Sequence, residues 1–173
     1  GSMEDEGGFK RMVEEILEVM RDERRIGAED RLGRVIVSAH SGGYRPAVYA
    51  VSRGGLGEQI SELFLFDAFY SLTEELIPWL KADKKHLLRS VYTAHLAGEH
   101  AAFQELLRTN RLRFAEEAPR DDSGQVADAP GMRAAAPRGL SALFEPTAES
   151  HSGVIFNRFE RWLESSALGE IER

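Results

Sequence analysis

Residues 34–51 read RVIVSAHSGGYRPAVYAV, and this stretch decides the fold. It opens with the β-branched run Val35-Ile36-Val37, which is typical of a buried strand. Small residues then surround Ser41, and a segment with helical spacing begins directly after them. The stretch therefore predicts a strand, a tight turn and a helix, with Ser41 at the apex of the turn.

The small residues on either side of Ser41 have a steric reason. A serine at a sharp strand-to-helix turn has a strained backbone, so the residues two before and two after it must be small. Ala39 and Gly43 meet that requirement. Such a turn lifts the hydroxyl clear of the sheet, and the helix N-terminus offers free N–H groups to a developing oxyanion. A surface turn that happens to contain serine and glycine stays open as the alternative.

The pentapeptide Ala39-His40-Ser41-Gly42-Gly43 resembles the G-x-S-x-G nucleophile elbow of the α/β-hydrolase superfamily, with alanine in place of the first glycine. The resemblance extends over most of the chain, which looks like the carboxyl-terminal part of such an enzyme. It implies an α/β fold with a mostly parallel sheet flanked by helices, a three-layer sandwich truncated at the N-terminus. We expect a fragment, a partner chain or missing N-terminal segment that completes the sheet, or a reduced variant of the fold.

Length and composition bound the function classes. The 173 residues suit a single domain, and 42% apolar and 29% charged residues are ordinary for a globular protein. The net charge is −7 and the basic residues are scattered, which argues against nucleic acid as a partner. The chain has no cysteine for disulfides or thiolate metal sites, and no apolar run long enough to predict a membrane span.

The first residues of the chain give little information about the fold or the cellular compartment. Gly1-Ser2-Met3 resembles the remnant of a removed expression tag, so residues 1–8 are expected to be a tag and a disordered start. No signal peptide is visible, and the sequence leaves the compartment open.

Strands alternate with helices along the rest of the chain. Apolar residues from Phe9 to Met20 have the three-four spacing of a helix expected to cover one side of the sheet. Further strands are expected at residues 62–66, 87–93 and, more weakly, 111–115, and further helices at residues 72–80 and 99–109. This alternation predicts a doubly wound α/β layer with right-handed crossovers.

The last third of the chain begins with a change of composition. Residues 116–150 are rich in Pro, Gly, Asp, Ala and Arg without periodicity, which predicts a long loop that shapes the substrate pocket. Apolar residues from Val154 to Leu163 then predict one C-terminal amphipathic helix.

A catalytic serine needs a base that accepts its proton, and the base needs a third group that orients it. In the superfamily these residues follow the chain order nucleophile, acid, histidine, each beyond the carboxyl end of a strand. The resemblance therefore implies Ser41 as nucleophile, Asp67 as acid and His151 as base, with the Gly42 N–H in the oxyanion hole. Tyr44 and Arg45 are expected to bind substrate, although solvated or core-capping roles remain open.

Alternatives exist for the acid and the base. Asp67 is also placed to cap the next helix, and Asp83 and Glu149 are weaker candidates for the acid. Among the other histidines, His95 competes with His151. We expect His40 to enter packing, His86 to be solvated among lysines and His100 to lie inside a helix, while Trp79 is expected in the core.

The resemblance implies a serine hydrolase that cleaves an ester or amide of a small molecule or peptide through an acyl-enzyme. No cofactor is expected. No metal is expected either, because His95 and His100 are five residues apart and no ligand-spaced carboxylates accompany them. The rival hypotheses are a non-catalytic hydrolase-like binding or assembly domain and a flavodoxin-like nucleotide binder.

Overall fold

The computed structural model describes residues 2–117, 139–166 and 168. Five strands form one sheet in the order β1-β2-β3-β5-β4, and every neighbouring pair is parallel. The strands are β1 (Val35–His40), β2 (Ile60–Phe66), β3 (Leu87–Tyr92), β4 (Phe114–Glu116) and β5 (Ala142–Pro146). The predicted α/β class with a parallel sheet flanked by helices is therefore confirmed.

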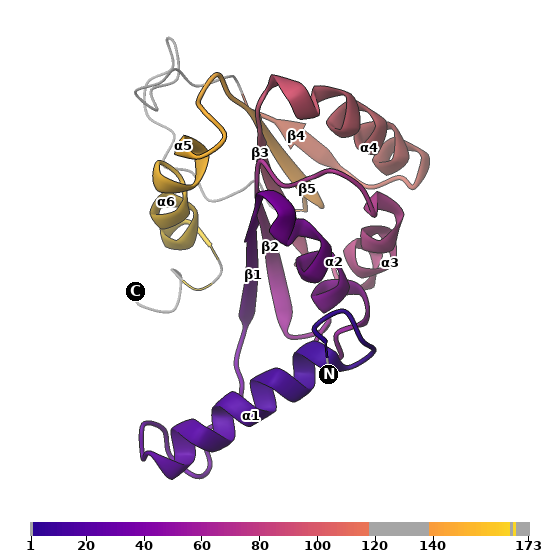
Figure 1. The fold of residues 1–173 in the computed structure, drawn as a ribbon. Helices are drawn as coiled ribbons and strands as arrows, with labels where there is room; N and C mark the ends of the chain where they lie inside the picture. The colour runs from indigo at the N-terminus through magenta and orange to yellow at the C-terminus, as the bar shows by residue number, and fades with distance from the viewer. Residues whose placement is uncertain (1, 118–138, 167, 169–173) are drawn as a thin grey trace.

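Helices lie on both faces of the sheet (Figure 1). One face carries α2 (Tyr44–Arg53), α3 (Leu76–Ala82) and α4 (Ala97–Thr109), and the other carries α5 (Gly153–Phe156) and α6 (Phe159–Glu164). Three 3-10 turns, η1 (Ser41–Gly43), η2 (Thr73–Glu75) and η3 (Ala94–Leu96), precede α2, α3 and α4. The two core clusters follow this division, because side chains of one strand alternate between the faces. Leu63 and Leu65 join the cluster under α2 to α4, whereas Phe64 and Phe66 pack with Trp162 of α6.

The first helix does not cover the sheet, contrary to the sequence-based expectation. α1 (Gly8–Asp22) has the predicted amphipathic pattern, but it extends away from the edge at which β1 begins (Figure 1). Only Gly8 and Phe9 are buried, and Ile16 and Val19 remain 49% and 55% exposed. Its N-terminal end is fixed by hydrogen bonds from the Gly7 and Lys10 amides to carbonyls at the end of α2.

The segment expected to be a loop contains a strand. β5 lies between β3 and β4, although it falls inside residues 116–150. Residues 118–138 of that expected loop lie outside the described residues. The single C-terminal helix predicted over residues 154–163 is instead two short helices, because the chain turns inward at Arg158, which is 1% exposed.

Two aromatic residues near α3 differ in how well they were predicted. Trp79 lies in the core as expected, and its indole N–H points at the carbonyls of Gly57 and Ile60. His86, expected in solvent, is buried and stacks on Trp79 with ring centroids 4.6 Å apart. Its Nδ1–H donates to the Trp79 carbonyl, which satisfies the buried ring.

Another buried histidine lies between the sheet and α4. His100 is fully buried, stacks on Tyr92 at 3.8 Å and donates from Nδ1 to the Leu96 carbonyl. Its Nε2 then accepts from the Ser90 hydroxyl, 2.8 Å away, so the ring is neutral and fully satisfied. Desolvation by burial lowers the pKa of His100 to about 4.

Within the described residues, no helix is both long and apolar enough to cross a membrane.

The low pKa of His100 predicts a loss of stability in mild acid. Because the unfolded histidine binds a proton near its usual pKa of 6.5 and the folded one does not, stability falls as pH decreases from 6.5 toward 4. The contribution is on the order of 3 kcal/mol in unfolding free energy. Urea denaturation across this interval should show a smaller pH dependence for His100→Asn than for the wild type. Equal pH dependence in the two proteins would contradict this assignment.

Candidate functional site

The predicted site residues gather at one edge of the sheet because all five strands are parallel. Ser41 follows β1, Asp67 follows β2, and Thr93 follows β3. His151 lies in the loop between β5 and α5. Side chains that are distant in sequence therefore meet beyond the carboxyl ends of the strands, which form the upper edge in Figure 1.

Ser41 occupies the strained turn that its neighbours predict. Its φ is +53°, in the left-handed region that disfavours residues with a side chain. A Cβ added to Gly43 would lie 3.6 Å from the Ala39 Cβ, so the two small residues face each other across the turn. The structure thus places a half-buried serine with a strained backbone between β1 and α2.

Asp67 is held by donors from two other segments. Its carboxylate is fully buried and accepts hydrogen bonds from the Thr93 amide at 2.8 Å and from the Thr93 hydroxyl at 3.1 Å. His151 Nδ1 lies 2.6 Å from its second oxygen. A buried carboxylate without partners would be costly, and these contacts supply them. The alternative role as a helix cap does not fit, since no helix begins directly after Asp67.

The proton positions follow from the acceptors. A carboxylate can only accept, so the His151 Nδ1 carries the proton that is donated to Asp67. With its proton on Nδ1, the neutral form of the ring has its lone pair on Nε2, and a general base needs such a lone pair. The His151 side chain is 39% exposed, so solvent or a substrate can reach it.

His40 connects the histidine loop to the serine turn. Its Nε2–H donates to the His151 carbonyl at 2.8 Å, and the two rings lie 4.7 Å apart. The residue before Ser41 therefore fixes the backbone of residue 151. Within the described residues the Ser41 hydroxyl and the His151 ring share no hydrogen bond. Catalytic hydrogen bonds often tighten only when a substrate is bound.

His95, the alternative candidate for the base, also lies near Asp67. Its Nδ1 lies 3.8 Å from the Asp67 carboxylate and 2.6 Å from the Thr93 hydroxyl. Because the Thr93 hydroxyl donates to Asp67, the His95 Nδ1–H donates to Thr93. His151 holds the direct and shorter contact with the acid. The sequence-based search for metal ligands paired His95 only with His100, and so missed that His95 and His151 flank one carboxylate.

A buried arginine fixes the loop that carries His151. Arg158 donates to Glu145 at the end of β5, to Glu149 in the loop, and to the Thr147 hydroxyl, at 2.7, 2.6 and 3.1 Å. Arg161 also donates to Glu145. Glu149, a weaker candidate for the acid, is thus used to attach the histidine loop to the sheet. The composition of residues 116–150, which predicted a loop without periodicity, gave no signal of the buried ionic network.

The remaining predicted residues lie around the serine turn. Gly42 is exposed, and a Cβ added to it would contact nothing within 4 Å. The Tyr44 hydroxyl contacts the Ser71 hydroxyl at 2.9 Å, and the Tyr44 ring packs near Tyr70. Arg45 forms a 3.0 Å ion pair with Glu4, which directs it toward the N-terminal turns. The structure thus brings Asp67 and His151 together at the sheet edge where Ser41 follows β1, but it does not bring Arg45 to them.

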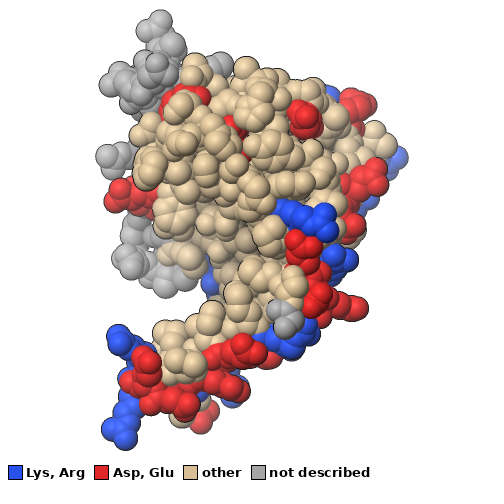
Figure 2. Space-filling model, in the orientation of Figure 1, with Lys and Arg blue, Asp and Glu red and all other residues tan. Residues whose placement is uncertain are grey.

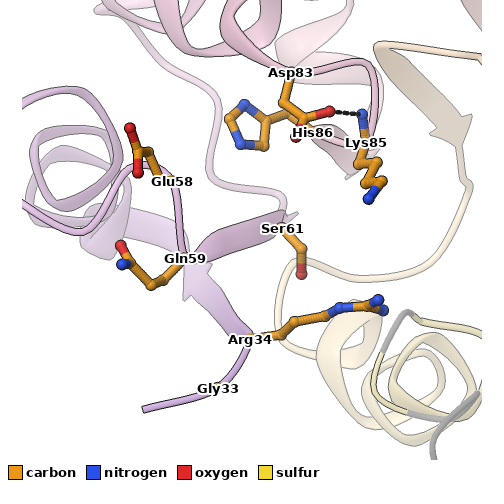
Figure 3. A pocket seen from close by; sticks show the side chains of 8 residues that line it. All are labelled: Gly33, Arg34, Glu58, Gln59, Ser61, Asp83, Lys85 and His86. Atoms are coloured by element: carbon orange, nitrogen blue, oxygen red, sulfur yellow. Dashed lines mark hydrogen bonds between the residues drawn. The ribbon is translucent and has the colours of Figure 1, made fainter. Parts of the chain in front are cut away.

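A separate hollow lies at the opposite edge of the sheet. Its lining residues precede β1, β2 and β3 or, in the case of Ser61, lie at the start of β2, and Figure 3 shows Arg34, Ser61 and Lys85 among them. Asp83, the other weak candidate for the acid, accepts there from the Lys85 amide. Because amino ends of parallel strands lie opposite their carboxyl ends, this hollow is remote from Asp67 and His151.

Comparisons of the chain with models of protein families, with curated proteins and with solved structures found no match. The geometry described above is therefore the basis for assigning a function.

The strained backbone at residue 41 predicts a difference between two substitutions. Ser41→Gly removes the strain of a left-handed conformation, which costs roughly 1–2 kcal/mol. Part of this gain is lost, because glycine raises the conformational entropy of the unfolded chain. Ser41→Ala keeps the strain. We expect Ser41→Gly to have an unfolding free energy about 0.5–1 kcal/mol above that of Ser41→Ala, measured by urea denaturation. A less stable glycine variant would contradict a strained turn.

The ionic network predicts unequal effects of its two arginines. Arg158→Met leaves Glu149 without its cation and should lower the unfolding free energy by about 3 kcal/mol or more. Arg161 is 37% exposed and shares Glu145 with Arg158. Arg161→Met should therefore cost less than about 1 kcal/mol, and chemical denaturation of both variants measures the difference. Similar losses would show that Arg158 does not anchor the loop.

Proposed function

We propose that this chain is a serine hydrolase of the α/β-hydrolase type that cleaves an ester or amide bond through Ser41, His151 and Asp67. The observation that carries the proposal is the 2.6 Å hydrogen bond between His151 and the buried Asp67, beside a serine whose backbone is strained. A histidine held in this way on a carboxylate is the orienting half of a catalytic triad.

The chemistry follows from the proton positions. Ser41 Oγ attacks the carbonyl carbon of the substrate while its proton passes to Nε2 of His151. The buried Asp67 stabilises the imidazolium that forms. His151 then gives the proton to the departing alcohol or amine, which leaves an ester on Ser41. A water molecule, deprotonated by the same nitrogen, hydrolyses this acyl-enzyme and frees the serine.

The negative charge on the carbonyl oxygen requires hydrogen-bond donors. The backbone N–H of Gly42, at the start of the turn that leads into α2, is the proposed first donor. A second donor is expected from a segment beyond β1, whose outer edge has no partner strand among the described residues. A partner chain or an N-terminal segment completing the sheet is part of this proposal.

The surroundings favour a substrate of low charge. Figure 2 shows charged side chains over α1 and along the right-hand margin of the view, while the upper part of the same face is mostly uncharged. Phe156, five residues after His151, is 83% exposed and offers an apolar contact. Tyr44 and Tyr70 add aromatic surface near the serine turn. We therefore propose a small-molecule or peptide ester or amide, with Tyr44 in contact with it and Arg45 limited to the margin.

The open edge of β1 also favours a second candidate function. A non-catalytic hydrolase-like domain would use this edge to bind or assemble with a partner, because unpaired strand edges form hydrogen bonds with added strands. Such a domain needs no reactive serine. Reactivity of Ser41 therefore separates the two functions.

The enzyme proposal predicts covalent labelling by a fluorophosphonate probe, which reacts with activated serines. The wild type should be labelled at Ser41, identified by mass spectrometry of the modified peptide, and Ser41→Ala should abolish labelling. Asp67→Asn should slow labelling by about a thousandfold, because an equivalent change in serine proteases costs roughly 10⁴-fold in turnover.

Ser38→Ala is the matched control, because Ser38 is exposed on the same strand three residues earlier. It should be labelled at the rate of the wild type. Folded wild-type protein that resists the probe would favour the non-catalytic domain.

A further inference from the structure

We propose that Asp67, His95 and His151 form a binding site for a divalent transition-metal ion of the zinc type. Each residue offers one ligand atom, and the three atoms lie within 4.8 Å of one another. The inhibitory consequence described below rests on the proposed hydrolase function, whereas the binding itself does not.

The donor set matches the chemistry of zinc. Two imidazoles and one carboxylate form a common three-ligand set, with the fourth tetrahedral position left to water. Both Nδ1 atoms approach the same carboxylate oxygen, Oδ2 of Asp67, at 2.6 Å for His151 and 3.8 Å for His95. Ligand atoms about 2.0–2.1 Å from a tetrahedral ion are about 3.3 Å apart, so these separations bracket the required one.

The site is accessible on one side and fixed on the other. Side chains of His95 and His151 are 52% and 39% exposed, so their rings can adjust and an ion can enter from solvent. Asp67 is fully buried and held by Thr93, which anchors the carboxylate in place. Hydrogen bonds of this kind orient ligands and raise the affinity of metal sites.

Metal binding at these atoms would switch off the proposed base. Coordination uses the lone pair of Nδ1, so the Nδ1 proton of His151 must move to Nε2. The ring stays neutral, but Nε2 now carries a proton and cannot accept one from Ser41. The ion would also bind the Asp67 carboxylate, which would then no longer accept the hydrogen bond from His151 Nδ1. We therefore infer that the metal-bound state is catalytically inactive and that the ion competes with the triad.

The experiment measures Zn²⁺ binding by isothermal titration calorimetry on the full chain, and Co²⁺ binding by its visible absorption, in the wild type, His95→Ala and Glu99→Ala. Partners that only orient a metal ligand contribute 10–100-fold to affinity, so losing the ligand itself should weaken binding at least tenfold. Glu99→Ala is the matched control, because it removes a charge four residues after His95 that is not part of the ligand set. It should bind like the wild type.

The same proteins are labelled with the fluorophosphonate probe with and without Zn²⁺. We expect Zn²⁺ to suppress labelling of the wild type. The same concentration of Zn²⁺ should leave labelling of His95→Ala unchanged. Absence of Zn²⁺ binding, unchanged affinity in His95→Ala, or faster labelling with Zn²⁺ would each overturn the inference. Zn²⁺ binding without any labelling in metal-free protein would instead refute the hydrolase and leave the metal site standing.

Discussion

The burial of one carboxylate organises the upper edge of this protein. Asp67 is fully enclosed, so its charge must be met by donors within the fold, and these come from the end of β3 and from the loop after β5. The carboxylate thereby joins three segments that are separated by up to 84 residues in the chain. Parallel pairing makes this meeting possible, because it brings the carboxyl ends of β2, β3 and β5 to the same side of the sheet.

Much of this architecture could be predicted from local patterns. Continuous apolar runs identified β2 and β3, and the small residues around Ser41 identified the turn, whose positive φ agrees with the steric argument. β5 was missed because it follows a Pro- and Gly-rich segment and carries a buried Glu145, whose charge is met by Arg158 and Arg161, more than ten residues further along the chain. The amphipathic pattern of α1 correctly predicted a helix but not its position, because an apolar stripe does not specify what it packs against.

The candidate site shows the same limit. The superfamily's order of nucleophile, acid and histidine, each beyond the carboxyl end of a strand, led to Asp67 and His151. Residues in such positions share one edge of a parallel sheet, and the structure places both residues there. The superfamily's order did not distinguish the roles of His95 and His151. His95 follows β3, which pairs with β2, and His151 follows β5, which pairs with β3, and this strand order exists only in three dimensions. His86 was misassigned for a related reason: neighbouring lysines indicated solvent, whereas its ring stacks on Trp79, seven residues earlier.

The position of the Arg158 network has a consequence for the biosynthesis of the protein. Domains begin to fold as the chain emerges from the ribosome, with N-terminal segments first. The serine turn and Asp67 emerge early, but His151 is fixed only when Glu145 and Glu149 meet an arginine several residues further along. The nascent chain would therefore carry Ser41, the proposed nucleophile, in an unreactive state, and the proposed activity would appear only once the C-terminal helices have docked.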